Sequence, residues 1–363
     1  MNAYITSIAT SNPRFKIKQQ DVLDFMIRAH QLKGVDADKL RVLYRATGIL
    51  SRYSVIEDYQ SSLVRQFFPD NKKLEPFPST QERLELFQQE AITLCVEAAK
   101  RALTTTRAEQ ITHLITVSCT GMYAPGIDIE LVDRLGLNSH VERTGINFMG
   151  CYAAFNAIKV ADAICTANKG AKVLVVCVEL CSIHFQKKAM DDYMLANALF
   201  GDGAAAVVVT GKPVTGVNLK TTSFFSELFR NGHEHMAWKI GNFGFEMRLS
   251  SYVPDVIESG VRLLTQKLLD KGGVDKFDYF AIHPGGKRIL QVIEKELGIS
   301  KRENQEAHDI LSEYGNMSSP TILFVLKRVM DKFNMEDNGK NLLGLAFGPG
   351  LTLESMLLTI ESH

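Results

Sequence analysis

The pattern of hydrophobic and polar residues alternates between helix-like and strand-like stretches along the chain. Residues 81–103 carry apolar positions at helical spacing and are followed by a short β-rich run, HLITVS (113–118). Helical spacing returns at 153–167, and the next stretch, AKVLVVCVEL (171–180), has the character of a buried strand. A turn then leads into another strand in GDGAAAVVVTG (201–211). Helices that alternate with strands predict a layered α/β fold.

The second half of the chain repeats this order of elements. The expected elements are a helix at 253–269, a strand in DYFAIHPGG (278–286), a helix at 287–297, a helix opening at YGNMSSP (314–320), and closing strands in NLLGLAFGPG (341–350) and LTLESMLLTI (351–360). Two halves with one element order indicate a duplicated α/β unit whose equivalent strand ends and helix starts meet at a shared site. We expect domains at 1–213 and 214–363. The stretch 224–250 looks irregular and aromatic, and we expect it to be an insertion that covers a pocket.

Charge and composition narrow the classes of partner. The 363 residues include 41 basic and 41 acidic side chains, so no broad field exists to attract nucleic acid or anionic lipid. A small molecule or a protein is the better expectation. The start, MNAYITSIATSNPRF, lacks a basic flank followed by an apolar stretch, and runs such as VLVVCV are too short to span a bilayer. We therefore expect a cytoplasmic protein.

The cysteines are expected to be reduced and mostly structural. The chain has six, at Cys95, Cys119, Cys151, Cys165, Cys177 and Cys181. No pair has CxxC spacing, so neither a zinc site nor a redox couple is indicated. Free cysteines are usually small buried hydrophobic residues, which is the expectation for most of these.

Cys151 stands apart because it follows a glycine and heads a helical run, in NFMGCYAAF (147–155). In a duplicated unit it begins a helix of the first half, whereas His283 ends a strand and Asn316 begins a helix of the second. A thiol at a helix N-terminus beside an imidazolium should have a lowered pKa, so we expect a thiolate near neutral pH that attacks acyl groups. The alternative is structural, since a cysteine is often a packing residue and His or Asn often ends an element.

Six ordered motifs resemble the type III polyketide synthases, the chalcone-synthase-like branch of the thiolase superfamily. They are GCYAAFNAIKVADAI, VLVVCVEL, ALFGDGAAAVVV, IHPGG, LSEYGNMSSPTILFVL and FGPGLTLE. The resemblance extends from about Ile5 to Leu358. It implies a homodimer of five-layered αβαβα subunits, with no metal and no permanently bound organic cofactor, acting on coenzyme A thioesters.

The resemblance implies a role for each residue of the site. Cys151 would be the nucleophile that carries the starter and the growing chain. His283 and Asn316 would hold the thioester carbonyl of malonyl-CoA and stabilise the enolate formed as carbon dioxide leaves. Phe200 matches an aromatic gatekeeper, although a buried aromatic that closes a turn is the structural alternative. Ser318 matches a cavity-lining serine, and it could also cap the helix that Pro320 starts.

Basic residues in two places are candidates to bind the phosphates of coenzyme A. The stretch DKLRVLYRATGILSRY supplies Lys39, Arg41, Arg45 and Arg52, and Arg288 follows HPGGK. The match to the plant pattern in the first stretch is loose, so these cations could instead form a solvated helix face.

Several expected cavity positions differ from the plant enzymes. Cys119, Cys181 and His184 stand where those enzymes carry threonines, and Met247 replaces a second gatekeeper phenylalanine. A coumaroyl starter is therefore not implied. Trp238 falls where a glycine controls cavity volume and would shorten the cavity, whereas Cys119 and Cys181 would suit an apolar side tunnel for a fatty acyl tail. Both outcomes remain open from the sequence.

The favoured function is an iterative decarboxylative Claisen condensation of malonyl-CoA onto a CoA-linked starter, followed by cyclisation to a pyrone, resorcinol or phloroglucinol. A second hypothesis is an initiating ketoacyl carrier protein synthase that performs one condensation. A third is a catalytically silent thiolase-fold subunit, against which the presence of Cys151, His283 and Asn316 argues. No nucleic acid or membrane partner is expected.

Overall fold

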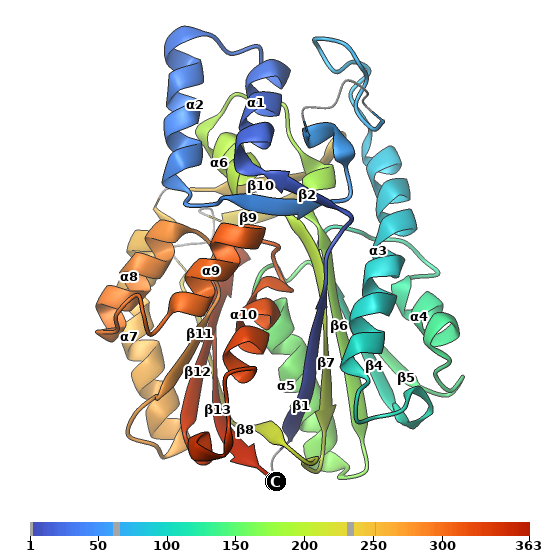
Figure 1. Ribbon diagram of the computed structural model, residues 1–363, viewed down its shortest axis with the longest axis vertical. Coiled ribbons are helices and arrows are strands. Elements are labelled where there is room, and N and C mark those ends of the chain that lie inside the picture. Colours follow the sequence, from blue (N-terminus) through green and yellow to red (C-terminus); the bar gives the residue numbers. More distant parts are fainter. Residues whose placement is uncertain (1–2, 61–65, 231–235, 251) are drawn as a thin grey trace.

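The computed structural model describes residues 3–60, 66–230, 236–250 and 252–363, and a nine-stranded sheet runs through its centre (Figure 1). The strand order is β11-β12-β13-β8-β1-β7-β6-β4-β5. The strands span β1 (Tyr4–Ser11), β4 (His113–Ser118), β5 (Glu142–Asn147), β6 (Lys172–Leu180), β7 (Asp202–Thr210), β8 (Val217–Leu228), β11 (Tyr279–Ile282), β12 (Asn341–Gly348) and β13 (Thr352–Ser362).

The sheet consists of two halves with the same pairing pattern. In the first half β4 pairs parallel with β6, β6 antiparallel with β7, and β7 antiparallel with β1. In the second half β11 pairs parallel with β12, β12 antiparallel with β13, and β13 antiparallel with β8. A short antiparallel contact between β1 and β8 joins them. The repeated pattern confirms the expected duplication.

Helices form three layers around these half-sheets (Figure 1). On one side α3 (Thr80–Ala102) contacts β1, β6 and β7, and α4 (Ile127–Leu135) packs on α3. On the other side α7 (Val253–Gly272) contacts β8 and β13, with α8 (Lys287–Leu297) beside it. Between them, α5 (Ala153–Ala167) and α10 (Thr321–Met330) each contact strands of both halves. The result is the expected five-layered αβαβα fold.

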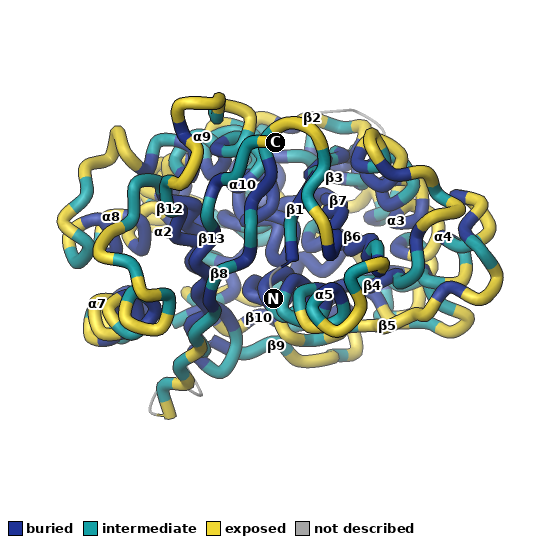
Figure 2. Tube along the Cα trace, turned by 90° about the horizontal axis from the view of Figure 1, so that it is seen from below, coloured by how far each residue is buried: buried dark blue, intermediate teal, exposed yellow. Residues whose placement is uncertain are grey.

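Both faces of the central strands are buried, which explains their continuous apolar sequence. In β7, Val207 and Val209 belong to the core shared with α5 and α10, whereas Ala206 and Val208 belong to the core under α3. Every residue of β7 is buried, and Figure 2 shows the buried residues gathered around the middle of the sheet. A strand covered on both faces has no need of the polar alternation typical of a half-exposed sheet.

A second group of elements lies across one end of the sheet (Figure 1). It comprises β2 (Phe15–Lys18), α1 (Gln19–Ala29), α2 (Gly34–Ala46), β3 (Ser51–Ser54), α6 (Asp191–Leu199), β9 (Met236–Gly241) and β10 (Gly244–Leu249), with α9 (Gln305–Tyr314) below. The expectation of an irregular insertion at 224–250 is wrong for the described residues, because β8 runs to Leu228 and β9 and β10 form an antiparallel hairpin. The turn Gly241–Gly244, with an Asn after the first Gly, was the overlooked signal.

Within the described part of the chain, no helix combines the length and apolar character needed to cross a bilayer.

Candidate active site

Cys151 lies in the turn between β5 and α5, with 4% of its surface exposed. Gly150 before it has a positive φ of 81°, and a Cβ there would lie 2.2 Å from Cδ of Pro349. A Cβ at Gly348 would likewise come within 3.2 Å of the Cys151 nitrogen. Glycine is therefore required at both positions. The 348–350 loop of the second half packs directly on the backbone of Gly150 and Cys151.

Asn316 is a polar partner of this thiol. The Cys151 thiol donates to Oδ1 of Asn316 at 3.9 Å, a long contact even for sulfur. The same Oδ1 accepts the backbone N–H of Ser318 at 2.8 Å, so the amide nitrogen of Asn316 points away from that bond. Asn316 was expected to begin a helix, but α10 starts only at Thr321. It lies instead in the loop between α9 and α10.

His283 follows the end of β11, as expected, and its backbone N–H donates to the Leu345 carbonyl at 2.8 Å. Its ring meets Phe347 edge to face, with centroids 5.4 Å apart. Phe347 leads into the loop that packs on Cys151, so β12 links the two side chains. Both ring nitrogens are buried without a hydrogen-bond partner among the described residues. A buried imidazole with unmade hydrogen bonds is costly and indicates a functional group.

Burial opposes formation of the expected thiolate. Burial raises the pKa of Cys151 to about 12, because desolvation outweighs the opposing hydrogen bonds of Ser318 and Asn316. Burial also lowers the pKa of His283 to about 3. No hydrogen bond joins these two side chains in the described structure, and burial favours the neutral form of each. Burial changes the Cys151 pKa more than the helix N-terminus does, although the sequence argument relied on that terminus to lower the pKa.

Glu179 is a buried carboxylate beside the thiol that the sequence argument missed. Its carboxylate accepts from the hydroxyls of Ser319 (2.6 Å) and Thr120 (2.7 Å) and from the backbone N–H of Cys119 (2.9 Å). Burial raises the pKa of Glu179 to about 7, although these bonds oppose the shift. The signal was available in the sequence, since a glutamate interrupts the otherwise apolar run of β6.

Six of the seven cavity residues expected from the sequence line one small pocket beside Gly150. They are Cys119, Cys181, Phe200, Trp238, Met247 and Ser318, and the pocket holds about 270 Å³ of space. Ser318 does not cap the following helix, because Pro320 occupies the N-cap position and no side-chain cap is formed. Its side chain instead forms a hydrogen bond with the Cys151 thiol, which opposes the rise in the pKa of that thiol.

Trp238 and His184 are fixed side chains of the pocket wall. The Trp238 indole N–H donates to the Cys119 carbonyl at 2.6 Å. His184 donates from Nε2 to the Thr120 carbonyl at 2.7 Å and accepts the Phe245 N–H at Nδ1, 3.0 Å away. Its ring stacks on Phe245 at 4.2 Å, and burial lowers its pKa to about 3. With both nitrogens engaged, His184 is a neutral structural residue rather than an acid or base.

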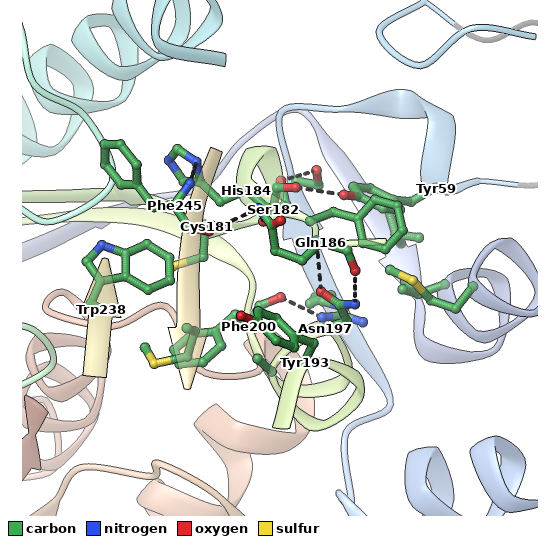
Figure 3. A pocket seen from close by; sticks show the side chains of 18 residues that line it. Tyr59, Cys181, Ser182, His184, Gln186, Tyr193, Asn197, Phe200, Trp238 and Phe245 are labelled. Atoms are coloured by element: carbon green, nitrogen blue, oxygen red, sulfur yellow. Dashed lines mark hydrogen bonds between the residues drawn. The ribbon is translucent and has the colours of Figure 1, made fainter. Parts of the chain in front are cut away.

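A larger pocket adjoins the small one (Figure 3). Four residues line both, namely Cys181, Phe200, Trp238 and Met247. Beyond these four it is bounded mainly by apolar and aromatic side chains. They include Ile17 of β2, Val22 and Met26 of α1, Phe185, Tyr193 of α6 and Phe245 of β10. The sequence argument did not assign α1 or β2 to the cavity, because these contacts join segments distant in the chain.

Three of the cations expected at a coenzyme A site are already engaged or enclosed. Lys39 lies 3.6 Å from Asp36, and Arg41 lies 2.7 Å from Asp38, each on the exposed surface of α2. Arg52 is buried, so the expectation that it belongs to the cations that bind coenzyme A phosphates is wrong.

The other two candidates are Arg45, in the last turn of α2, and Arg288, in the first turn of α8. A Cβ at Gly48, just after α2, would lie 3.2 Å from the side chain of Lys287. Arg288 pairs with Asp255 at 2.9 Å. Arg45 and Lys287 are exposed and have no ion pair among the described residues. Lys287 was not among the expected cations.

No group of three or more His, Cys, Asp or Glu side chains is placed to hold a metal ion within the described residues.

Comparison with known proteins places the chain in a family. Residues 1–213 match the N-terminal domain of chalcone and stilbene synthases, and residues 221–361 match their C-terminal domain. The chain belongs to this family of type III polyketide synthases, which are acyltransferases. A relative from Mycobacterium tuberculosis, the "alpha-pyrone synthesis polyketide synthase-like Pks18", is 32% identical, with 99% of this chain and 91% of that protein covered.

Two solved structures share the fold closely. PKS-I from the brown alga Ectocarpus siliculosus has a TM-score of 0.92 at 30% identity, covering 99% of this chain and 98% of that one. The C-terminal type III polyketide synthase domain of Steely1, a type I/III hybrid from Dictyostelium, has a TM-score of 0.90 at 29% identity, with 99% of both chains covered.

Proposed function

We propose that the protein extends an acyl starter, loaded from coenzyme A onto Cys151, by repeated decarboxylative condensation with malonyl-CoA and releases a cyclised product. The observation that carries the proposal is the contact of the Cys151 thiol with Asn316 at 3.9 Å. His283, whose buried ring nitrogens have no partner among the described residues, contacts Phe347 just before the loop that packs on Cys151. The first half, residues 1–213, supplies the nucleophile. The second half, residues 214–363, supplies the other two groups.

Loading begins with proton transfer from the thiol to the neutral imidazole. Because His283 is unprotonated at rest, it accepts the Cys151 proton as sulfur attacks the starter thioester. The tetrahedral intermediate collapses to an acyl-enzyme, and the same proton leaves on the thiol of coenzyme A. A neutral pair suits this step, since only an unprotonated base can accept the proton.

Extension uses the free donors of Asn316 and His283. Malonyl-CoA loses carbon dioxide, and the electron pair of the broken bond becomes the enolate of acetyl-CoA. The amide nitrogen of Asn316 and the protonated ring nitrogen of His283 stabilise the enolate oxygen, each at about 3 kcal/mol. The enolate carbon attacks the acyl-enzyme and breaks its C–S bond, which leaves a β-ketoacyl-CoA two carbons longer and expels Cys151 as a thiolate that takes up a proton from solvent. That product is reloaded for the next round.

An apolar starter fits the walls of the larger pocket. Its lining is aromatic and aliphatic over most of its surface, and it begins at the four residues that also bound the small pocket. Apolar surface of this kind favours a hydrocarbon chain. The relative from Mycobacterium tuberculosis is named for α-pyrone synthesis, which supports a pyrone as the cyclised product here.

Arg45 and Lys287 are the cations best placed to bind the phosphates of coenzyme A. Gly48, three residues after Arg45, lies close to the Lys287 side chain, and Lys287 follows His283 by four residues. Unlike Lys39, Arg41 and Arg288, they need not break an existing ion pair to bind a phosphate.

The exposed edge strand β5 supports a homodimer. β5 pairs only with β4 at the end of the sheet, and most of its residues are exposed (Figure 2). Met122 and Met149 are exposed nearby. An unprotected edge with apolar neighbours is a surface that proteins normally cover, here by a second copy. Analytical ultracentrifugation tests this, and Ile146→Lys in β5 should give the monomer.

Mass spectrometry of the intact protein after incubation with an acyl-CoA tests the catalytic assignment. The proposal expects one acyl group, located on the peptide that contains Cys151 and absent from Cys151→Ala. Acylation at another residue, or none with any acyl-CoA, would contradict it. Product formation that needs malonyl carrier protein instead of malonyl-CoA would favour the single-condensation synthase.

A further inference from the structure

Arg52 in β3 is buried and incompletely hydrogen-bonded. It is 4% exposed, and Nη1 donates to the backbone carbonyl of Phe200 at 2.5 Å. Nε and Nη2 are also buried, and neither has a hydrogen-bond partner among the described residues. Leaving buried donors of a charged group unpaired costs several kcal/mol. Stability alone is therefore a poor explanation for an arginine at this position.

The carbonyl that Arg52 holds belongs to a crossing of two segments. Phe200 and Asn316 form an isolated parallel bridge between the end of α6 and the loop before α10. The Asn316 N–H donates to the Leu199 carbonyl, and the Gly201 N–H donates to the Asn316 carbonyl, both at 2.9 Å. The expected gatekeeper and the amide that contacts Cys151 therefore share one backbone unit.

The stem of Arg52 packs against this crossing from one side. A Cβ at Gly201 would lie 3.2 Å from Cβ of Arg52 and 2.8 Å from the Tyr314 carbonyl. A Cβ at Gly315 would lie 3.7 Å from Cβ of Arg52 and 2.7 Å from the Leu199 carbonyl. The two glycines allow the segments to approach each other this closely, and Arg52 is the side chain that covers them.

No carboxylate among the described residues forms an ion pair with the Arg52 guanidinium. Asp202 is buried nearby, but its carboxylate accepts from the Val55 N–H and from the N–H and hydroxyl of Ser182, and forms no ion pair with Arg52 within the described structure. On its other side lies the buried Tyr44, whose pKa burial raises to about 12 against the opposing charge of Arg52. The Arg52 side chain also opposes this shift through a hydrogen bond to Tyr44, while its Nη1 is the group that donates to the Phe200 carbonyl.

We infer that Arg52 is a positioning residue, which fixes Phe200 and Asn316 as one rigid unit facing Cys151. This inference rests on the proposed function, in which Asn316 stabilises the enolate and Phe200 bounds the starter pocket. Without the guanidinium the Phe200 carbonyl loses its hydrogen bond, so the Phe200 backbone becomes more mobile. Because Asn316 is joined to it by the backbone bridge, Asn316 becomes more mobile as well. The consequence is slower decarboxylation together with weaker discrimination between starters.

Steady-state kinetics of malonyl-CoA decarboxylation on purified Arg52→Met tests the inference. The turnover number should fall about 10- to 100-fold, as expected for a misplaced group, while KM for malonyl-CoA changes less than about twofold. The melting temperature should stay equal or rise, because unpaired buried donors are removed. Arg52→Gln carries the same expectation, so the test does not depend on one variant folding. Arg52→Lys, which retains a charged donor, should recover part of the turnover.

Gln19→Leu is the matched control. The Gln19 side chain is buried and donates to the Ala198 carbonyl at 2.8 Å, at the same end of α6, without bonding Phe200. Its turnover should stay within about twofold of wild type. Wild-type turnover in Arg52→Met and Arg52→Gln, or an equal loss in Gln19→Leu, would overturn the inference. Absence of decarboxylation in the wild-type protein would instead overturn the proposed function, and the role of Arg52 with it.

Discussion

The indole N–H of Trp238 donates to the backbone carbonyl of Cys119 at 2.6 Å, which joins the β9–β10 hairpin to the loop after β4 across the small pocket. This bond holds the largest side chain of the pocket wall in place, at the boundary between the small pocket and the larger one. The sequence left open whether Trp238 shortens the cavity or Cys181 opens a tunnel. In the structure both line the same boundary, so Trp238 limits the passage between the pockets.

Trp238→Ala should widen this passage. The expected result is a rise of about tenfold or more in kcat/KM for long-chain starters relative to hexanoyl-CoA, because pocket size discriminates between acyl lengths. Trp238→Phe keeps most of the bulk but loses the bond to Cys119, and should change the ratio little. Competition assays with paired starters measure it. An unchanged ratio in Trp238→Ala would show that the acyl chain does not pass this residue.

The pH dependence of Cys151 alkylation tests the neutral resting pair. Because burial raises the pKa of Cys151 to about 12, its reaction with iodoacetamide should rise about tenfold per pH unit from pH 6 to 9. Peptide mass spectrometry separates Cys151 from the other cysteines. A plateau between pH 6 and 8 that disappears in His283→Gln would reveal a thiolate–imidazolium pair and contradict the neutral assignment.

Glu179 should make the folded protein less stable as pH rises. Burial raises the pKa of Glu179 from 4.5 to about 7, so in this window the folded state keeps a proton that the unfolded state has lost. The free energy of unfolding therefore falls between pH 4.5 and 7, by about 3 kcal/mol at most. Glu179→Gln removes this dependence. In denaturant unfolding, the free energy of unfolding of the variant should rise relative to that of wild type from pH 5 to pH 8. A difference between the two that stays constant with pH would refute the raised pKa of Glu179.

The two unpaired cations should control coenzyme A affinity. Arg45→Ala and Lys287→Ala are each expected to raise KM for malonyl-CoA about three- to tenfold, and the effect should shrink at high salt. Arg41→Ala is the control, because Arg41 already pairs with Asp38 at 2.7 Å. Steady-state kinetics at low and high ionic strength distinguish them. An equal effect in all three variants would point to general surface charge.

Periodic stretches of the sequence were predicted accurately, and features made by contacts between distant segments were not. The expected helices at 153–167 and 287–297 coincide with α5 and α8, because their apolar spacing and flanking glycines are local signals. The helix expected at Asn316 starts five residues later, since Ser318 adopts a positive φ of 57° and Pro320 takes the N-cap. Such a loop conformation depends on its neighbours in space.

The chemistry of the site shows the same division. Cys151, His283 and Asn316 were found from motifs that carry their own local signal. The buried state of Arg52 was not, because its environment comes from β3, α6 and the loop before α10, which are far apart in sequence. The sequence argument also predicted a lowered pKa for Cys151, whereas burial raises it. Desolvation depends on the packing of both halves around the thiol, which the sequence does not show.

Mass spectrometry of the products formed from malonyl-CoA and a panel of starters, by wild type and by Cys151→Ala, tests the central claim most directly. The panel includes acetyl-, hexanoyl-, lauroyl-, palmitoyl-, benzoyl- and coumaroyl-CoA. Wild type should form triketide or tetraketide products, with pyrones from apolar starters preferred, and Cys151→Ala should form none while still decarboxylating malonyl-CoA. Equal product formation by Cys151→Ala, or no extension of any starter by wild type, would contradict the assignment of Cys151 as the nucleophile of an iterative condensing enzyme.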